Sequence, residues 1–415
     1  MLINDYMLAE DANRYKWLNS IKMKVGLPYF GGKSRIGKYL FNNIFNLAVQ
    51  MKKDGKPADI FIDAFTGGGK MGLSVPVGWF NTIVMNDLDY GVYSFYKCCQ
   101  DKDNYIKLIL MIEEIGKIMC ADLFYEAAWI RKFGPGADKY NEKNTPNPVQ
   151  KDEVIEPVVA AALTYWVTSS SYNCQTSPKT ATYNIASELK DSTSNRIEKQ
   201  NITKIVDRAR KVIPKIHEQL NKHNYIIENL DYKELIKKYN GLSYVDLTGK
   251  EHDADESYNE KNKLWYFDPP YHPATLYGGE EAPYADTFSE QQANDMVDIL
   301  SNKDKSTYGE LFYFIKSDYD PKETVARAEA NIESETDPNL LKWYNEVINN
   351  KDKLCRLFAD LEKDSYMKIC IGSFDKGTMV FNDDVGDWER SVGKEYIWTR
   401  GFPEGYDKIE GEEAQ

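Results

Sequence analysis

The sequence predicts an α/β protein: a mainly parallel β-sheet covered by helices on both faces, interrupted by an all-helical insertion. Short β-rich apolar runs bounded by turn residues recur along the chain, and helical patterns fall between several of them. Apolar strands that alternate with helices are typical of a parallel sheet buried on both faces. The predicted strands are residues 59–65, 81–87, 225–229, 264–268 and 311–317.

The clearest helical patterns lie at residues 37–53 and 289–300, and Ser289 provides an N-cap for the second. Residues 248–260 are acidic and lack apolar periodicity, which predicts a surface loop. Near the end of the chain we expect a hairpin-containing edge of the sheet, with strands at 366–372, 378–383 and 395–400.

The alternation of strands and helices breaks between about residues 100 and 222. Helical patterns in this region are separated by a polar loop at 131–153 and by a Ser/Thr/Asn-rich stretch at 168–184. We therefore expect an insertion into the sheet domain. The predicted domains are a discontinuous sheet domain at 1–100 and 223–405, a helical insertion at 101–222 and an acidic tail at 406–415.

The composition indicates a folded protein larger than one compact core, because the chain has 415 residues and 42% hydrophobic content. Its 6 cysteines follow no regular spacing and form no CxxC pair, so neither a disulfide framework nor a zinc site is predicted. No apolar run of about 18 residues and no secretion signal occur. We expect a cytoplasmic protein without a membrane span and without a metal.

The net charge of -13 argues against a nucleic-acid partner, since phosphate contacts need a positive surface. The distribution of charge is uneven, however. Residues 301–415 hold 16 basic and 25 acidic residues, a net of -9, whereas residues 176–222 hold 10 basic and 5 acidic residues, a net of +5. From charge alone, a solvated helix face is the favoured interpretation of the basic patch.

Two glycine-rich segments, YFGGKSRIG at 29–37 and DAFTGGGKMG at 63–72, resemble phosphate-binding loops. The Walker pattern requires a glycine five residues before the Gly-Lys pair. Leu27 and Ala64 occupy those positions. An NTPase is therefore disfavoured.

The second glycine-rich segment has the features of an adenosine site. A predicted strand ends in Asp63, and the glycines at 67–69 permit a tight turn and a close backbone approach by a ligand. The next strand leads to Asp87, whose carboxylate can accept hydrogen bonds from both ribose hydroxyls. NAD and S-adenosylmethionine both carry adenosine. Because the glycine spacing also fits the G-x-G-x-x-G pattern, the turn alone leaves both cofactors open.

The stretch LWYFDPPYHP at 264–273 ends a predicted strand in Asp268, two prolines and Tyr271. Neither proline can donate to a sheet ladder, so the chain leaves the sheet at its carboxyl edge, where open α/β sheets bind ligands. The prolines hold the Asp268 carboxylate, the Pro269 carbonyl and the Tyr271 ring in rigid mutual geometry. Two acceptors beside a flat aromatic surface suit a planar group that bears an NH2, such as the exocyclic amine of a base.

This set of groups fits methylation of an adenine amine. The N6 amine is a poor nucleophile because its lone pair is delocalised into the ring. Acceptors on both N–H bonds would localise the lone pair on nitrogen while the tyrosine stacks on the ring. A methyl sulfonium held in line could then be attacked directly, without a metal or a strong base, so His272 stays outside the catalytic set. For the tetrapeptide alone, a simple strand-ending turn is the rival interpretation.

Over residues 27–400, and in the same order, the chain resembles the Dam-like D12 class of DNA adenine-N6 methyltransferases, especially its longer members from phages and Gram-positive bacteria. YFGGKSRI (29–36) is similar to the N-terminal motif of that class, FIDAFTGGGKMGL (61–73) to its F-x-G-x-G cofactor loop and NDLDYGVYSFY (86–96) to its acidic second motif. ENLDYKELI (228–236) resembles the segment beside the cofactor adenine, DPPYHP (268–273) the catalytic motif, and IKSDYD (315–320) the far side of the catalytic pocket.

The resemblance implies a Rossmann-like, S-adenosylmethionine-dependent methyltransferase sheet domain, with the insertion as a target-recognition domain whose basic patch approaches phosphates. The partner implied is double-stranded DNA with a flipped target base, and an Asp at position 268 is typical of adenine-N6 enzymes. The implied catalytic residues are Asp268, Pro269 and Tyr271, and the implied cofactor-binding residues are Tyr29, Lys33, Asp63, Phe65, Gly67, Gly69, Asp87, Asp231, Tyr232 and Asp268.

The chain departs from the class in two respects. Tyr29 replaces the usual tryptophan, and neither the 248–260 segment nor the acidic C-terminal segment has a counterpart in compact members. The alternatives are a methyltransferase that acts on RNA or another amine, and a non-catalytic DNA-binding relative. The sequence leaves open the DNA recognition sequence, the base-reading residues in 101–222, a cognate nuclease in a restriction–modification pair, and the oligomeric state.

Overall fold

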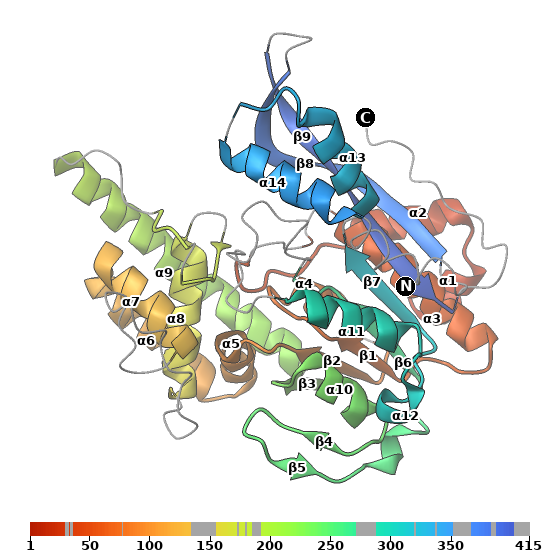
Figure 1. The fold of residues 1–415 in the computed structure, drawn as a ribbon. Coiled ribbons are helices and arrows are strands. Elements are labelled where there is room, and N and C mark those ends of the chain that lie inside the picture. Colours follow the sequence, from red (N-terminus) through yellow and green to blue (C-terminus); the bar gives the residue numbers. More distant parts are fainter. Residues whose placement is uncertain are drawn as a thin grey trace.

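The central element is a seven-stranded sheet in the order β3-β2-β1-β6-β7-β9-β8 (Figure 1). The computed structural model describes residues 1–29, 33, 36–76, 78–133, 155–171, 174–178, 181–184, 192–270, 288–318, 321–336, 338–351, 367–382 and 387–401. The strands are β1 (Ile60–Asp63), β2 (Thr82–Asn86), β3 (Tyr225–Glu228), β6 (Lys263–Phe267), β7 (Phe314–Asp318), β8 (Met367–Asn382) and β9 (Asp387–Arg400).

The first five strands in this order pair in parallel, which confirms the predicted mainly parallel sheet. β9 pairs antiparallel with both β7 and β8, so the C-terminal edge is a hairpin. The prediction of three late strands was wrong, because 366–372 and 378–383 fall in the single strand β8. β8 pairs with β9 on both sides of the stretch that was expected to separate two strands. Two shifts of register in β8 accommodate the irregular residues without ending the strand.

Alternate residues of the strands enter two separate cores. Phe61 of β1 joins a large cluster with α3 (Gly37–Lys53) and α5 (Tyr90–Gln100), whereas Ile60 and Ile62 join a second cluster on the opposite face. That second face is covered by α10 (Tyr232–Tyr239) and α11 (Glu290–Leu300). Burial of both faces explains why the strands are apolar throughout. The sheet-forming part of the chain also contains the shorter helices α1 (Ile3–Leu8), α2 (Asp11–Ser20) and α12 (Lys305–Tyr308).

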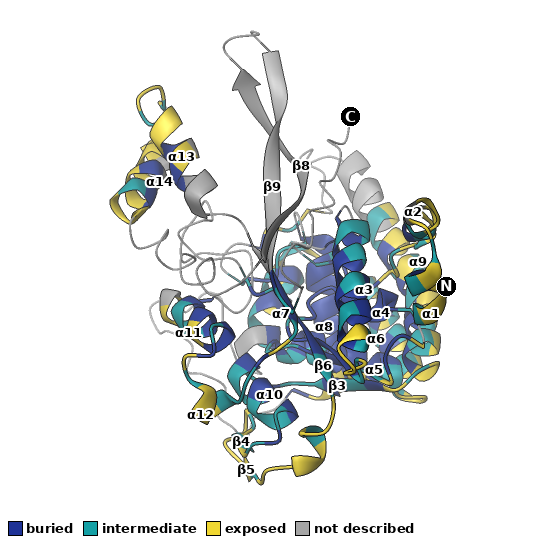
Figure 2. Ribbon diagram, turned by 90° about the vertical axis from the view of Figure 1, so that its right-hand side faces the viewer, coloured by how far each residue is buried: buried dark blue, intermediate teal, exposed yellow. Residues whose placement is uncertain are grey.

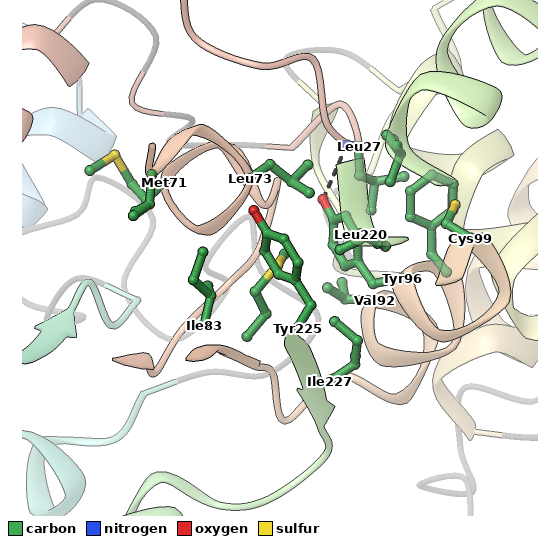
Figure 3. Close-up of a cluster of buried hydrophobic side chains, with 14 of the residues drawn as sticks. Leu27, Met71, Leu73, Ile83, Val92, Tyr96, Cys99, Leu220, Tyr225 and Ile227 are labelled. Atoms are coloured by element: carbon green, nitrogen blue, oxygen red, sulfur yellow. Dashed lines mark hydrogen bonds between the residues drawn. The ribbon is translucent and has the colours of Figure 1, made fainter. Parts of the chain in front are cut away.

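The larger core reaches the glycine-rich turn that precedes α4 (Lys70–Ser74). Figure 3 shows Met71 and Leu73 of α4 packed with Tyr225, Ile227 and Leu220. The Leu27 backbone N–H donates to the Tyr96 hydroxyl at 3.2 Å, and the Tyr225 hydroxyl donates to the Gly72 carbonyl at 3.2 Å. These hydrogen bonds attach the N-terminal segment and the turn to the core.

Four helices lie between α5 and β3 in the chain, in the region predicted to be helical: α6 (Asn104–Ile118), α7 (Ala121–Phe133), α8 (Pro157–Ser170) and α9 (Ser192–Asn221). They gather on one side of the sheet, with α5 packed against both α8 and β3 (Figure 1). α8 is buried along most of its length (Figure 2). The Tyr165 hydroxyl donates to the Ile205 carbonyl at 3.1 Å, which joins α8 to α9. Because the larger cluster runs from the sheet into these helices, they share their core with the sheet.

Two expected loops contain regular structure. Residues 248–260 were expected to be a surface loop and are mostly exposed, but they also contribute β5 (Glu251–His252), which pairs with β4 (Tyr244–Val245), and a 3-10 turn at Glu256–Tyr258. The Asp246 carboxylate closes the hairpin by accepting the Thr248 and Lys250 backbone N–H groups. The first three residues of the polar loop expected at 131–153 belong to α7, which continues to Phe133.

The C-terminal part contains one further helical unit. α13 (Pro321–Asn331) and α14 (Pro338–Asn349) pack through a small separate cluster that includes Val325, Tyr344 and Val347. The predicted acidic tail at 406–415 lies outside the described residues. No helix in the described part of the chain is long and apolar enough to cross a membrane.

Candidate active site

Two adjoining pockets lie at the carboxyl ends of β1, β2 and β6, where the order of strands reverses about β1. We call them the loop pocket, which includes Gly68, Lys70 and Tyr266, and the aromatic pocket, which includes Asn86, Leu230 and Phe288. Tyr29, Phe65, Gly67 and Asp268 line both, so the two pockets are continuous. The residues named from the sequence that line one or both are Tyr29, Lys33, Asp63, Phe65, Gly67, Gly69, Asp87, Asp231, Tyr232, Asp268 and Pro269.

The glycine-rich turn between β1 and α4 is compact. Gly67 has φ 46° and Gly69 has φ 68°, conformations that L side chains rarely adopt. A Cβ added at Gly67 would lie 2.9 Å from the Tyr29 ring, and one added at Gly69 would lie 2.3 Å from the Tyr96 hydroxyl. The turn therefore requires glycine at both positions and presents bare backbone to the pockets.

Asp87 stabilises this turn from the end of β2. Its Oδ2 accepts the Gly67 backbone N–H at 2.7 Å, and its Oδ1 accepts the Asp89 backbone N–H at 2.9 Å. Each carboxylate oxygen has two lone pairs, so both can still accept from a ligand. The residue expected at the ribose hydroxyls thus also positions the backbone of the turn.

Asp63 is the most perturbed acid of the site. Its carboxyl is buried at the end of β1, and Oδ2 accepts the Gly72 backbone N–H at 3.1 Å. Oδ1 has no hydrogen-bond partner among the described residues. Burial is the largest cause that raises the pKa of Asp63 to about 8; the nearby Asp268 and Asp87 carboxylates contribute to this rise, and the Gly72 backbone hydrogen bond opposes it. A cationic group placed beside Asp63 would favour its ionised form.

Asp268 follows β6 and forms an ion pair with Lys33. The Lys33 Nζ lies 2.9 Å from the Asp268 Oδ1, and the two side chains are 6% and 17% exposed. Pro269 lines the loop pocket, and Pro270 lines the aromatic pocket. The chain that leaves β6 therefore passes between the two pockets. Tyr271 and His272 lie outside the described residues.

Three aromatic rings form an apolar wall in the aromatic pocket. The Phe65 centroid lies 5.8 Å from that of Tyr232 and 6.1 Å from that of Phe288, and the last two lie 5.9 Å apart. The spacing suits the face of a flat heterocycle. Phe288 was not among the site residues predicted from the sequence. A signal existed, because an apolar residue directly before the Ser289 N-cap is the first half of a hydrophobic staple with Ala293.

Asn86 was also not predicted as a site residue, and its side chain links two walls of the aromatic pocket by hydrogen bonds. Its buried Nδ2 donates to the Ala64 and Leu230 carbonyls, both at 3.0 Å, and its Oδ1 accepts the Leu230 backbone N–H at 2.9 Å. Next to Leu230, Asp231 caps α10 by accepting the Lys233 backbone N–H, and burial raises the pKa of Asp231.

A buried arginine connects this site to the helices α7 and α8. Arg131, near the end of α7, pairs with Asp89, which lines the aromatic pocket and caps α5. The Arg131 Nε donates to the Thr164 hydroxyl at 3.1 Å, and its Nη1 donates to the Thr176 carbonyl at 3.1 Å. The Arg131 side chain has 0% exposure. One guanidinium therefore holds α7, α8 and the segment after α8 against the rim of the pocket.

A family model described as D12 class N6 adenine-specific DNA methyltransferase matches residues 29–310. The matched range runs from Tyr29 to α12, and it contains both pockets and the helices α6 to α9. No curated protein matches the chain.

Proposed function

Because this chain belongs to the D12 class of N6 adenine-specific DNA methyltransferases, we propose that the loop pocket and the aromatic pocket together hold S-adenosylmethionine and the target adenine of DNA. Enzymes of this class transfer a methyl group from S-adenosylmethionine to adenine N6 in DNA. When bound, that cofactor supplies an electrophilic methyl group on a sulfonium.

The residues present fit the cofactor. The wall of Phe65, Tyr232 and Phe288 would receive its adenine ring, and Asp87 would accept from its ribose hydroxyls. The buried Asp63 Oδ1 would accept from its cationic amino group, which would bring the pKa of Asp63 back toward the ordinary range of a carboxyl. Tyr29 and Gly67 would lie against the cofactor between these sites, because both line the two pockets.

Asp268 and Pro269 are proposed to act on the target amine. The Asp268 carboxylate and the Pro269 carbonyl would accept the two N6–H bonds, and Tyr271 would stack on the base. Nitrogen then uses its localised lone pair to form the N–C bond as the C–S bond breaks. The C–S electron pair stays on sulfur, and the surplus proton passes from N6 to the Asp268 carboxylate. Lys33 holds Asp268 ionised and oriented before the base arrives. Direct attack of this kind requires no metal.

An adenine inside a duplex cannot reach this site, so we propose that the base is flipped. The helices at 104–221 are proposed to recognise the target, as the insertion expected at 101–222. The observation that carries the proposal is Asp268. It stands in the expected motif, at the switch point of the sheet, and it lines both pockets.

Transfer of a labelled methyl group to duplex DNA, followed by digestion and detection of N6-methyladenine, tests the proposal. Wild type should label duplex DNA in preference to RNA of the same sequence. Tyr271→Ala should abolish labelling while calorimetry still detects S-adenosylmethionine binding. Tyr244→Ala is the matched control, because Tyr244 lies on β4 and stacks on His252 outside both pockets. Normal methylation by Tyr271→Ala would remove the stacking role.

Two broader expectations accompany this proposal. The chain resembles the longer phage and Gram-positive members of the class, and its irregular cysteine spacing favours a reducing cytoplasm. Methylation-sensitive sequencing of DNA from a host that expresses the protein would identify the recognition sequence. It would also show whether the modified sites match those of a cognate nuclease.

A further inference from the structure

The outer face of α9 carries a row of basic residues. Lys204, Arg208, Lys211 and Lys215 follow the spacing i, i+4, i+7 and i+11, which places them on one face of a helix. All four are exposed, and we call them the basic stripe. The opposite face of α9 is buried in the larger core through Ile205, Ala209, Ile213, Ile216 and Leu220.

The charge of the basic stripe is not neutralised by neighbouring acids. None of its four side chains forms an ion pair within the part of the chain that the structure describes. Arg210, on another face of the same helix, behaves differently, since it pairs with Glu113 at 2.6 Å and with Asp207 at 3.3 Å. The sequence-level excess of positive charge at 176–222 is therefore concentrated on one face of α9.

One member of the stripe acts electrostatically on a residue that lines the loop pocket. Arg208 lies close enough to Lys70 to influence it electrostatically: burial lowers the pKa of Lys70, Cys174 opposes that shift, and the Arg208 charge adds to it. Lys70 lines the loop pocket at the start of α4, and α4 packs beside α9. Two cations held near each other repel, and an anion bound between them would relieve that repulsion.

We propose that the basic stripe and Lys70 bind the sugar–phosphate backbone of the DNA substrate and guide it along α9 to the loop pocket. The inference rests on the proposed function for the identity of the polyanion. Residues 204 to 215 span about 16 Å at about 1.5 Å per helical residue. That length corresponds to roughly five nucleotides of one strand at about 3.4 Å each. Such contacts position the duplex without reading its sequence.

The dependence of DNA affinity on salt measures these contacts. Fluorescence anisotropy of a labelled duplex, titrated over a salt series, should give a steeper slope of log K against log salt for wild type than for Lys211→Gln/Lys215→Gln. The slope should fall by about 1.8 for two lost phosphate contacts, at about 0.9 each. Adding Lys204→Gln and Arg208→Gln should roughly double that loss. S-Adenosylmethionine binding by calorimetry should stay unchanged in all of them.

Arg210→Gln is the matched control, because it removes one positive charge from the same helix at a side chain that is already paired. Its slope should equal that of wild type. An unchanged slope in the stripe variants, with methylation of DNA intact, would overturn the role of the stripe and leave the proposed function standing. Absence of any DNA methylation by wild type would instead overturn the proposed function. Tighter, stripe-dependent binding of RNA than of duplex DNA would overturn DNA as the partner.

Discussion

Lys33 and Asp268 form a largely buried ion pair, with 2.9 Å between the Lys33 Nζ and the Asp268 Oδ1. Lys33 precedes α3, and Asp268 follows β6, so two distant parts of the chain meet in the loop pocket. The ammonium donates to an oxygen that is proposed to accept from the N6 amine. In the ligand-free protein it therefore orients the carboxylate for that contact.

Replacing Asp268 should separate stability from activity. Asp268→Asn leaves the Lys33 ammonium buried without its carboxylate, so the free energy of unfolding in urea should fall by up to about 3 kcal/mol. Methyl transfer should fall by at least about 100-fold, because the charged acceptor for N6–H becomes a neutral amide. The double variant Lys33→Met/Asp268→Asn should recover stability while staying inactive. Recovered methyl transfer in the double variant would contradict the role of Asp268.

Gly67→Ala should weaken S-adenosylmethionine binding by at least about tenfold. The new Cβ would meet the Tyr29 ring at 2.9 Å, and the turn would have to shift away from Asp87. Gly55→Ala is the matched control, since Gly55 has φ 73° with nothing within 4 Å of an added Cβ. Both variants carry about 1–2 kcal/mol of left-handed strain, so only calorimetry of cofactor binding should distinguish them. Equal affinities would show that the turn does not contact the cofactor.

The elevated pKa of Asp63 predicts a specific pH dependence of stability. Its pKa is about 8 in the folded protein against an ordinary value of 3.8, so between these values the folded state holds a proton that the unfolded chain has released. Stability should therefore fall as pH rises through this window, by at most about 1.4 kcal/mol per pH unit. Denaturant titrations from about pH 5 to pH 8 should show a shallower fall for Asp63→Asn.

The control for this measurement is Asp101→Asn. Backbone hydrogen bonds from Asn104 and Asp103 lower the pKa of Asp101, so this carboxyl is ionised in both states throughout the window. The variant should differ from wild type by a constant offset. Parallel curves for wild type and Asp63→Asn would show that Asp63 is already ionised in the free protein.

Arg131→Met should destabilise the protein by about 3–5 kcal/mol, because it leaves the Asp89 carboxylate buried without its cation. Its binding of S-adenosylmethionine should also weaken, since the Asp89 backbone N–H supports Asp87. Arg210→Met provides the comparison. Its guanidinium is 53% exposed, so loss of its ion pairs should leave the free energy of unfolding close to that of wild type. Thermal unfolding and calorimetry of both variants test the contrast, and equal destabilisation would contradict it.

Local patterns in the sequence were sufficient for most of the architecture. Apolar runs located the five parallel strands, and Ser289 marked the start of α11. The late hairpin was harder, because bulges interrupt the pattern of β8 and only its pairing with β9 shows that it is one strand. The short strand β5 within the surface segment at 248–260 was not predicted for a related reason, since it depends on a partner strand outside the segment.

The sequence by itself determined which residue types stand at the ends of the strands: Asp63 and the glycines after β1, Asp87 after β2, and Asp268 with two prolines after β6. These are local properties, because turn glycines and strand-ending prolines act through their own backbone. Only the tertiary structure decided which of these ends share a pocket, that Lys33 pairs with Asp268, that Phe288 completes an aromatic wall, and that Arg131 buries its charge against Asp89. Such contacts join residues far apart in the chain, and they form only when the parallel strands bring their carboxyl ends to one edge of the sheet.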